Sequence, residues 1–295
     1  MRFAAIDIGS NAVRLLVEDL SFESGVVQTE KIAFTRMPIR LGEDVFESGQ
    51  ISKGKADQLV LVLQAFSRLM ESLDVRHFQV CATSAMREAT NRDLIVDRVG
   101  QEAGLRIDVI NGRQEAELIF RNFSVSMLDP RRDYLYIDVG GGSTELTWIR
   151  EAQPTLSKSF KIGAVRMLRG KVKPKVWDSI EAFLAKRPSG NASDMEPLTA
   201  IGTGGNINRM ARLSGYNRHT PIPLEKLIDV HAIVERHSIE ERMTLLGMKP
   251  DRADVIIPAG EIYLRIMEAA GAQEIIVPKV GLADGMILEM FRASL

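Results

Sequence analysis

Two carboxylates flank a run of glycines in the middle of the chain. Asp138 ends an apolar segment, and Glu145 follows the glycines at positions 140–142. Glycine lacks a side chain and tolerates positive φ angles, so the backbone N–H groups of such a turn can surround an anion. Amide donors, phosphate oxygens and a divalent cation held by carboxylates form a coherent set for phosphate chemistry. Residues 134–150 therefore predict a strand, a phosphate-binding glycine hairpin and a returning strand.

The chain begins with a similar pattern. Asp7 ends the first apolar segment, Gly9 follows it, and Arg14 takes the place that Glu145 has in the second copy. Two copies that lie 131 positions apart (138 minus 7) are too distant for a solenoid and indicate a duplicated domain. The two hairpins are expected to face each other across a central cleft. Phosphate binding is expected at the turns, from Gly9, Ser10, Asn11, Gly140, Gly141, Gly142, Ser143 and Thr144.

The carboxylates of the two hairpins are candidate metal ligands. Asp138 and Glu145 are expected to hold a metal ion and to position a water molecule, with Asp7 as a third carboxylate. Hard oxygen ligands beside phosphates favour Mg²⁺ or Mn²⁺. A single aspartate at the end of a strand is usually a turn residue, but its repetition in two glycine hairpins indicates more than a turn. Arg14 either contacts phosphate or simply pairs with an acid.

The composition describes an ordinary globular protein with two domains. The 295 residues are 45% hydrophobic and 26% charged, and they exceed what one typical core accommodates. A net charge of −1 argues against a general nucleic-acid-binding protein. The single cysteine, Cys81, excludes an internal disulfide and fits a buried, unreactive thiol in a reducing compartment. No apolar run is long enough to span a membrane and no signal peptide is visible, so we expect a cytoplasmic protein without membrane contact.

Hydrophobic periodicity and turn residues predict an α/β fold with a repeated element order. The first half reads as three strands followed by helix, strand, helix, strand and helix, at residues 3–8, 13–18, 26–36, 55–73, 78–83, 88–103, 106–110 and 111–127. Asn111 and Gln114 form a capping-box pattern at the start of the last of these helices. The second half repeats the three strands at 134–139, 145–150 and 155–162, with a polar loop at 188–197 and later strands at 198–201 and 274–277. We therefore expect two ribonuclease-H-like domains, at 1–128 and 129–295, with a last helix that can pack back on the first domain.

The two hairpins belong to a longer series of distinctive segments: AIDIGSNAVRLLV (5–17), IRLGEDV (39–45), ATSAMREATN (82–91), VINGRQEAELIF (109–120), YIDVGGGSTEL (136–146), KIGAVRM (161–167), AIGTGGNINRMARL (200–213) and VPKVGLADGMIL (277–288). In this order they resemble the exopolyphosphatase and guanosine pentaphosphate phosphohydrolase family of the actin-like superfamily. The resemblance covers nearly the whole chain. It implies two actin-like domains and an acid anhydride hydrolase that uses a divalent metal.

The resemblance also implies roles for residues outside the hairpins. Glu115 matches the family's catalytic glutamate and would orient the attacking water, while Arg87 would bind phosphate. The loop with Gly202, Gly204 and Gly205 resembles the one that approaches a nucleotide in actin-like proteins, and we expect it to contact phosphate. Two residues depart from the family pattern, Gln114 for a glutamate and Asn206 for a threonine. Without the resemblance, Glu115 would read as a helix-dipole residue in a first turn.

The expected function is release of terminal phosphate from inorganic polyphosphate, guanosine pentaphosphate or both. The expected partners are polyphosphate or guanosine penta- and tetraphosphate, and a homodimer is compatible with the sequence. Two alternatives remain open, an actin-like kinase that transfers the γ-phosphate of ATP and a non-catalytic sensor of guanosine alarmones. The basic segment 169–175 could follow a polyphosphate chain, although a solvated run of charges is the simpler interpretation.

Overall fold

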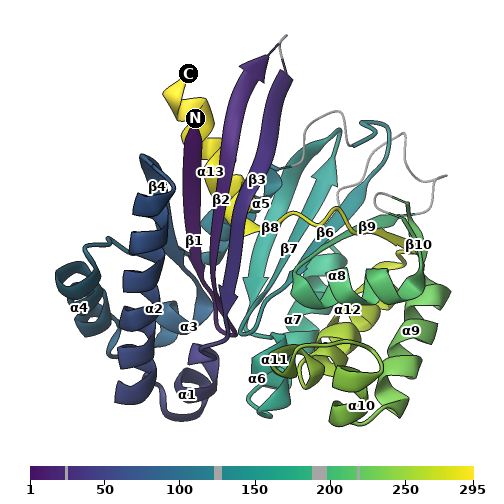
Figure 1. Ribbon diagram of the computed structural model, residues 1–295. Helices are drawn as coiled ribbons and strands as arrows, with labels where there is room; N and C mark the ends of the chain where they lie inside the picture. Colours follow the sequence, from purple (N-terminus) through teal and green to yellow (C-terminus); the bar gives the residue numbers. More distant parts are fainter. Residues whose placement is uncertain (24–25, 123–127, 188–197, 218–219) are drawn as a thin grey trace. The chain divides into compact units, whose positions relative to one another are not determined.

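The computed structural model describes residues 1–23, 26–122, 128–187, 198–217 and 220–295 (Figure 1). These residues divide into two compact units. The first unit comprises Met1–Asn122 together with Gly281–Leu295, and the second comprises Phe123–Val280. Each unit contains one mixed β-sheet with helices packed on it.

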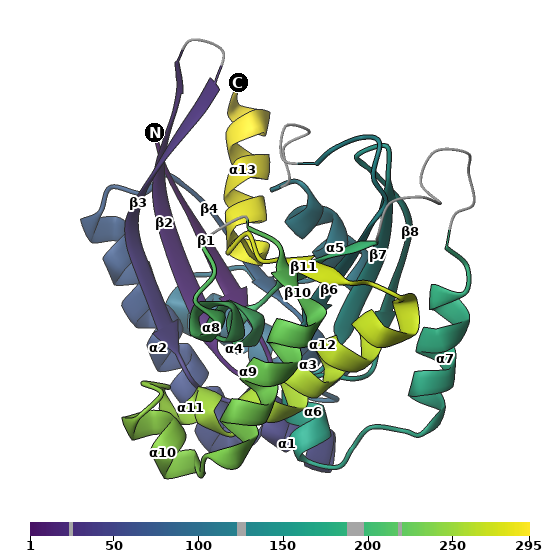
Figure 2. The same cartoon turned by 90° about the vertical axis from the view of Figure 1, so that its right-hand side faces the viewer.

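The sheet of the first unit has the strand order β3-β2-β1-β4-β5. Its central strand β1 runs antiparallel to β2 and parallel to β4. Helices α2 and α4 pack together on one side of this sheet, and α13 packs against β1, β2 and β4 from the other side (Figures 1 and 2). The elements of this unit are β1 (Arg2–Ile8), β2 (Val13–Glu23), β3 (Val26–Met37), α1 (Leu41–Ser48), α2 (Lys53–Ser72), β4 (His77–Ala82), α3 (Ser84–Glu88), α4 (Arg92–Ala103), β5 (Asp108–Val109), α5 (Gly112–Phe120) and α13 (Leu282–Ser294).

The sheet of the second unit has the order β10-β11-β9-β6-β7-β8. Strand β6 runs antiparallel to β7 and parallel to β9, and α12 packs against β6 and against α6, α7, α8 and α9. The elements of this unit are β6 (Tyr134–Val139), β7 (Thr144–Arg150), β8 (Gln153–Phe160), α6 (Ala164–Leu168), α7 (Lys175–Leu184), β9 (Thr199–Thr203), α8 (Gly205–Ser214), β10 (Ile222–Pro223), α9 (Leu224–Arg236), α10 (Ile239–Thr244), α11 (Pro250–Ala253), α12 (Ile256–Ala270) and β11 (Glu274–Ile276).

The duplication expected from the sequence is present in the topology. The order β3-β2-β1-β4-β5 recurs as β8-β7-β6-β9-β11, with the same antiparallel and parallel pairings. The register repeats as well, since Asp7 pairs with Arg14 across β1 and β2 and Asp138 pairs with Glu145 across β6 and β7. The predicted fold class, two ribonuclease-H-like units of the actin-like type, is confirmed.

Several predicted element boundaries are wrong, and the causes lie in tertiary contacts. The helix expected at 88–103 begins only at Arg92, because the chain is extended at Ala89 and the side chain of Asn91 is bonded to a distant segment. The Asn91 side chain accepts from the Ile51 amide (3.0 Å) and donates to the Ile51 carbonyl (2.8 Å). Helix α1 was not expected, and α12 begins at Ile256 instead of position 259. The polar loop expected at 188–197 and the end of the helix expected to reach 127 lie outside the described residues.

Candidate active site

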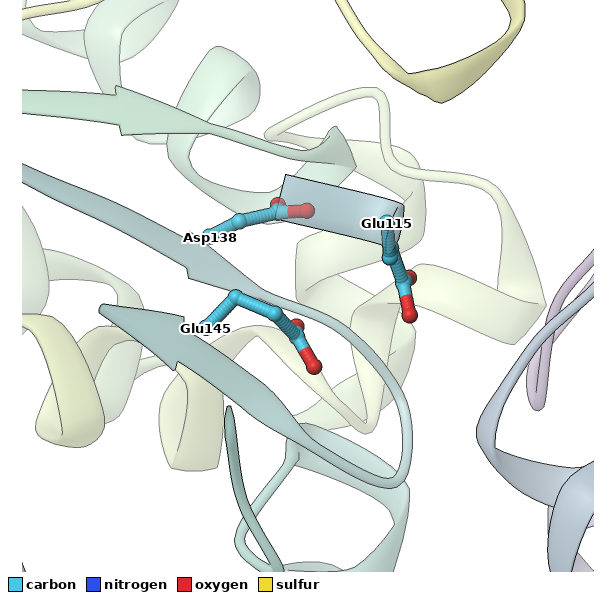
Figure 3. Close-up of side chains that lie close together, drawn as sticks. All are labelled: Glu115, Asp138 and Glu145. Carbon is cyan, nitrogen blue, oxygen red and sulfur yellow. The ribbon is translucent and has the colours of Figure 1, made fainter. Parts of the chain in front are cut away.

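The second glycine hairpin places two acids directly opposite each other. Asp138 and Glu145 are register partners of the antiparallel strands β6 and β7, and the Gly140 amide donates to the Ser143 carbonyl (3.0 Å) to close the turn. Carboxylate oxygens of the two acids lie within 4.8 Å of each other (Figure 3). Like charges directly opposite on a sheet repel, and a cation between them would remove that cost. The donor set therefore fits a hard divalent cation.

Glu145 is held firmly within this unit. Its side chain is 1% exposed, and the Ser159 hydroxyl of β8 donates to Glu145 Oε1 (2.8 Å). Thr144, its neighbour, is also buried and donates its hydroxyl hydrogen to the Ile162 carbonyl (2.7 Å). The position of this carboxylate is thus fixed by β7, by β8 and by the segment that follows β8.

The carbonyl groups of the hairpin glycines are bonded to helix α6. The amides of Ala164 and Val165 donate to the carbonyls of Gly140 (2.9 Å) and Gly141 (2.8 Å), and the Arg166 guanidinium donates to the Gly142 carbonyl (2.7 Å). Arg166 is buried in this contact. Sequence reasoning gave Arg166 no role, although the segment 161–167 was among the distinctive ones.

Space is tight at Gly140 of this hairpin, and the expectation of positive φ angles is wrong. None of the positive-φ residues in the described chain belongs to positions 140–142. A Cβ on Gly140 would lie 3.2 Å from the Ser143 carbonyl oxygen. The tightest point is Gly163, where a Cβ would lie 2.6 Å from the Gly141 carbonyl carbon. Gly163 thus lets the segment before α6 approach the hairpin backbone, and sequence reasoning missed it.

The first hairpin repeats this turn with a different pair of charges. The Gly9 amide donates to the Ala12 carbonyl (3.1 Å), as Gly140 does to Ser143. Here Arg14 Nη1 forms an ion pair with Asp7 Oδ2 at 2.5 Å, and Asp7 is 4% exposed. Of the two interpretations of Arg14, the structure shows the pairing with an acid.

Helix α1 holds the first hairpin from the side. The amides of Gly42 and Arg40 donate to the carbonyls of Ser10 (2.8 Å) and Asn11 (3.0 Å). Ser10 is 3% exposed, and its hydroxyl has no hydrogen-bond partner among the described residues. A buried hydroxyl without a partner is costly, and a ligand oxygen could satisfy it. The burial of the Ser10 hydroxyl and its ability to donate a hydrogen bond are compatible with the expected phosphate contact.

Glu115 and Arg87 lie together in the first unit. Asn111 and Gln114 form the predicted capping box, in which the Asn111 side chain accepts from the Gln114 amide (3.0 Å) and the Gln114 side chain accepts from the Asn111 amide (2.9 Å). This places Glu115, 8% exposed, in the first turn of α5. Arg87 Nη1 lies 3.8 Å from Glu115 Oε2 and donates to the Ile110 carbonyl (2.7 Å). Gln114 therefore keeps the capping role through its side-chain oxygen, a role that a glutamate at this position would also fill.

The three glycines expected to bind phosphate after β9 have different surroundings. Gly204 has φ +110°, and a Cβ there would lie 3.2 Å from Asp138 Oδ1, so this glycine lies beside the acidic pair. A Cβ on Gly205 would lie 2.8 Å from the Arg252 guanidinium, which places a basic group at this loop. A Cβ on Gly202 would lie 2.7 Å from the side chain of Ile275, so this glycine is needed for core packing.

Tyr263 joins the ends of the strands that carry this loop and Asp138. Its buried hydroxyl donates to the Thr203 carbonyl and accepts from the Val139 amide (3.2 Å). Burial, and then the charge of Asp138, raise the pKa of Tyr263 well above its usual value. Tyr263 therefore stays neutral and keeps its hydrogen. Its sequence position, far from both loops, gave no signal of this contact.

The remaining titratable candidate is unreactive. Cys81 is fully buried in β4, and burial, followed by the charges of nearby carboxylates, raises the pKa of its thiol to about 12. A thiol with this pKa is protonated near neutral pH and is not a nucleophile. The expectation of an inert cysteine is confirmed.

Among the described residues, no helix combines the length and apolar character needed to cross a membrane.

The duplicated sheet, with a glycine hairpin in each unit, defines a protein of the actin-like fold. The family model described as "Ppx/GppA phosphatase family" matches residues 23–293. The chain belongs to this family, as its sequence motifs indicated.

Curated relatives and solved structures match nearly the whole chain. Exopolyphosphatase 1 of Mycobacterium tuberculosis (strain H37Rv) is 28% identical, over 98% of this chain and 88% of that protein. A guanosine-5'-triphosphate,3'-diphosphate pyrophosphatase of Aliivibrio fischeri is 26% identical, over 98% of this chain and 60% of that protein. The crystal structure of an exopolyphosphatase from Cytophaga hutchinsonii has a TM-score of 0.81 at 21% identity, covering 99% of this chain and 98% of its own. The structure of the Aquifex aeolicus PPX-GPPA enzyme has a TM-score of 0.74 at 25% identity, and the match covers 98% of this chain and 99% of that one.

Proposed function

We propose that this protein is a phosphoanhydride hydrolase that releases terminal phosphate from inorganic polyphosphate, guanosine pentaphosphate or both. Membership of a phosphatase family supports the reaction type. The names of the relatives, exopolyphosphatase and guanosine-5'-triphosphate,3'-diphosphate pyrophosphatase, support these two substrate classes. The observation that carries the proposal is the pair Asp138 and Glu145, two acids placed opposite each other beside a glycine turn.

The acidic pair is the proposed metal site. Asp138 and Glu145 would hold Mg²⁺ or Mn²⁺, and the bound ion would neutralise charge on the phosphate oxygens. The corresponding pair in the first unit is Asp7 with Arg14, in which a guanidinium already supplies the positive charge. We therefore assign the metal to the second hairpin, and keep Asp7 as a residue that orients Arg14.

Glu115 is the proposed group that orients and deprotonates the attacking water. Glu115 lies in the first turn of α5 with Arg87 Nη1 at 3.8 Å from its Oε2, and its carboxylate oxygens can accept a hydrogen bond from water. Arg87 is proposed to donate to the transferred phosphate from its anchored position on the Ile110 carbonyl. The two compact units are proposed to act as the two domains, so that Glu115 of the first and the acidic pair of the second serve one reaction.

The hairpin backbones are the proposed phosphate cradles. In the second hairpin, the Gly140, Gly141 and Gly142 carbonyls are bonded to α6, which favours an anion on the amide side of the turn. Gly204 and Gly205 are retained as proposed phosphate contacts because they lie beside Asp138 and Arg252. Gly202 is assigned to packing. The cytoplasmic location and the homodimer stay predictions.

The proposal is tested first by Glu115→Gln. We expect kcat for phosphate release to fall about 10²- to 10⁴-fold, the usual range for loss of a general base, with little change in the affinity for the substrate. The matched control is Glu117→Gln on the same helix, where the glutamate forms an exposed ion pair with Arg113 (2.8 Å). The control is expected to retain turnover. Undiminished turnover in Glu115→Gln would remove this residue from the mechanism.

The substrate class is tested by measuring phosphate release from long polyphosphate, short polyphosphate and guanosine pentaphosphate side by side, with Mg²⁺ and with a chelator. We expect metal-dependent release from at least one of the three without any acceptor molecule. Product that forms only with ATP and an acceptor would indicate the kinase alternative. Tight nucleotide binding with no turnover under any metal would indicate the sensor alternative.

A further inference from the structure

Helices α5 and α13 touch through their backbones at Gly285. A Cβ at this position would lie 1.9 Å from the Leu118 carbonyl oxygen and 2.7 Å from its carbonyl carbon. No side chain fits at such a distance, and the obstacle is backbone that cannot rotate away. The two helices are separated by more than a hundred residues in the sequence. Gly285 therefore fixes how closely α13 approaches α5.

Two further contacts join the same helices. The Asn122 side chain donates to the Gly281 carbonyl (2.9 Å), just before α13 begins. Arg121 Nη1 forms an ion pair with Glu289 Oε1 at 3.2 Å. Together with Gly285, these contacts hold the C-terminal half of α5 at several points along α13.

Helix α13 is itself anchored to the sheet of the first unit. It packs against β1, β2 and β4 (Figure 2). Its Phe291 ring meets the Phe3 ring of β1 edge-on, with 5.7 Å between the ring centroids. Met286, Ile287 and Phe291 are buried in this contact. Because α13 is packed firmly on the sheet, its contacts with α5 also determine the position of α5.

We propose that Gly285 is a positioning residue for Glu115. Glu115 and Leu118 are three residues apart on α5, so they lie on adjacent turns of one face. A Cβ at position 285 would push the Leu118 backbone away and carry the first turn of the short helix with it. Displacements of about 1 Å at a reacting group can cost about 10²-fold in rate. This inference rests on the proposed function of Glu115 as the water-orienting group.

Gly285→Ala is the direct test. We expect kcat to fall about tenfold to a hundredfold while KM changes less than about threefold, because the added Cβ meets the backbone of Leu118 and the side chain of Asn122 and no residue of a hairpin turn. The matched control is Gly100→Ala within helix α4 of the same unit, where nothing lies within 4 Å of the added Cβ. The control is expected to match the wild type in kcat and to be equally or more stable. Rates are compared well below the unfolding midpoint of each variant.

A double-mutant cycle separates positioning from a general structural effect. In a Glu115→Gln background, Gly285→Ala should lower the residual turnover less than about threefold, because the group it positions has been removed. Full additivity of the two losses would overturn the inference. Wild-type kcat in a folded Gly285→Ala variant would overturn it as well. In both cases the hydrolase proposal itself would stand, since it is judged by phosphate release from the three substrates and by Glu115→Gln without any change at position 285.

A milder variant covers the case in which Gly285→Ala does not fold. Asn122→Ala removes the hydrogen bond to the Gly281 carbonyl without introducing a clash. We expect a threefold to tenfold loss of kcat with KM unchanged, which again disappears in the Glu115→Gln background. Wild-type kcat in Asn122→Ala, alongside an unfolded Gly285→Ala, would show that the α5–α13 contact stabilises the fold without positioning Glu115.

Discussion

The duplicated hairpins place different charges at the same two positions. Asp7 faces Arg14 in the first unit, while Asp138 faces Glu145 in the second. An acid opposite a base stabilises a sheet, and an acid opposite an acid destabilises it. A protein that keeps the second arrangement in a buried position accepts a cost in stability, which a bound cation can offset. The residue types at this pair thus distinguish the copy that we propose to bind the metal from the other copy.

This reasoning predicts the effect of Glu145→Gln on the metal-free protein. The amide retains the acceptor for the Ser159 hydroxyl (2.8 Å) and removes one negative charge. We expect the free energy of unfolding in EDTA to rise by about 0.5–1 kcal/mol, while Mg²⁺ no longer raises the unfolding midpoint. Thermal unfolding with and without Mg²⁺ measures both effects. Glu151→Gln on the turn after β7 is the control, and equal behaviour of the two variants would argue against a metal at this pair.

At the scale of elements, α13 meets β2 through two carboxylates, a buried one on Glu18 and a half-buried one on Asp284. Glu18 of β2 is 6% exposed, and its pKa is raised to about 7 by burial and then by the charge of Asp284 on α13. Lys31 of β3, 3.9 Å from Glu18, opposes this shift. The pKa of Asp284 is also raised by burial, and Lys31 and Arg14 oppose that shift. When α13 is packed on the sheet, the carboxyl groups of Glu18 and Asp284 therefore bind protons more readily than they do in the unfolded chain.

The sign of the pH dependence follows from the raised pKa of Glu18. The folded protein holds this proton up to about pH 7, while the unfolded chain releases it near the ordinary value of 4.5. The free energy of unfolding should therefore fall as pH rises from about 4.5 to 7, by up to about 3 kcal/mol from this group. Urea unfolding between pH 5 and 8 measures it. In Glu18→Gln the fall should largely disappear, and an identical slope in both proteins would contradict the assignment.

At the scale of the whole molecule, the two units differ in how the chain builds them. The second unit is one continuous segment, whereas the first combines Met1–Asn122 with Gly281–Leu295. Without α13, the face of β1 and β2 that contacts Phe291 and Met286 would be exposed to water. An exposed apolar sheet face removes much of the free energy that stabilises a small domain.

We therefore predict that a fragment of residues 123–280 folds alone and that a fragment of residues 1–122 does not. Circular dichroism and denaturant titration of the separate fragments measure this. Adding a synthetic peptide of residues 281–295 to the first fragment should restore a cooperative transition. Cooperative unfolding of residues 1–122 without the peptide would show that α13 is dispensable for that unit.

The sequence by itself determined the features that depend on neighbouring residues or on repetition. The paired hairpin patterns gave the duplicated topology, the Asn111–Gln114 spacing gave the capping box, and the motif series gave the family. Turn residues, caps and strand periodicity act over a few positions, so they can be read from a single chain.

Tertiary structure decided the features that depend on residues far apart in the chain. The break between α3 and α4 comes from Asn91 bonding to Ile51, and the role of Tyr263 comes from a hydroxyl that reaches two distant strand ends. The requirement for glycine at 163 and 285 comes from neighbouring backbone atoms that packing brings within 3 Å of the place where a Cβ would lie. No local pattern carries this information, because these distances exist only after the chain has folded.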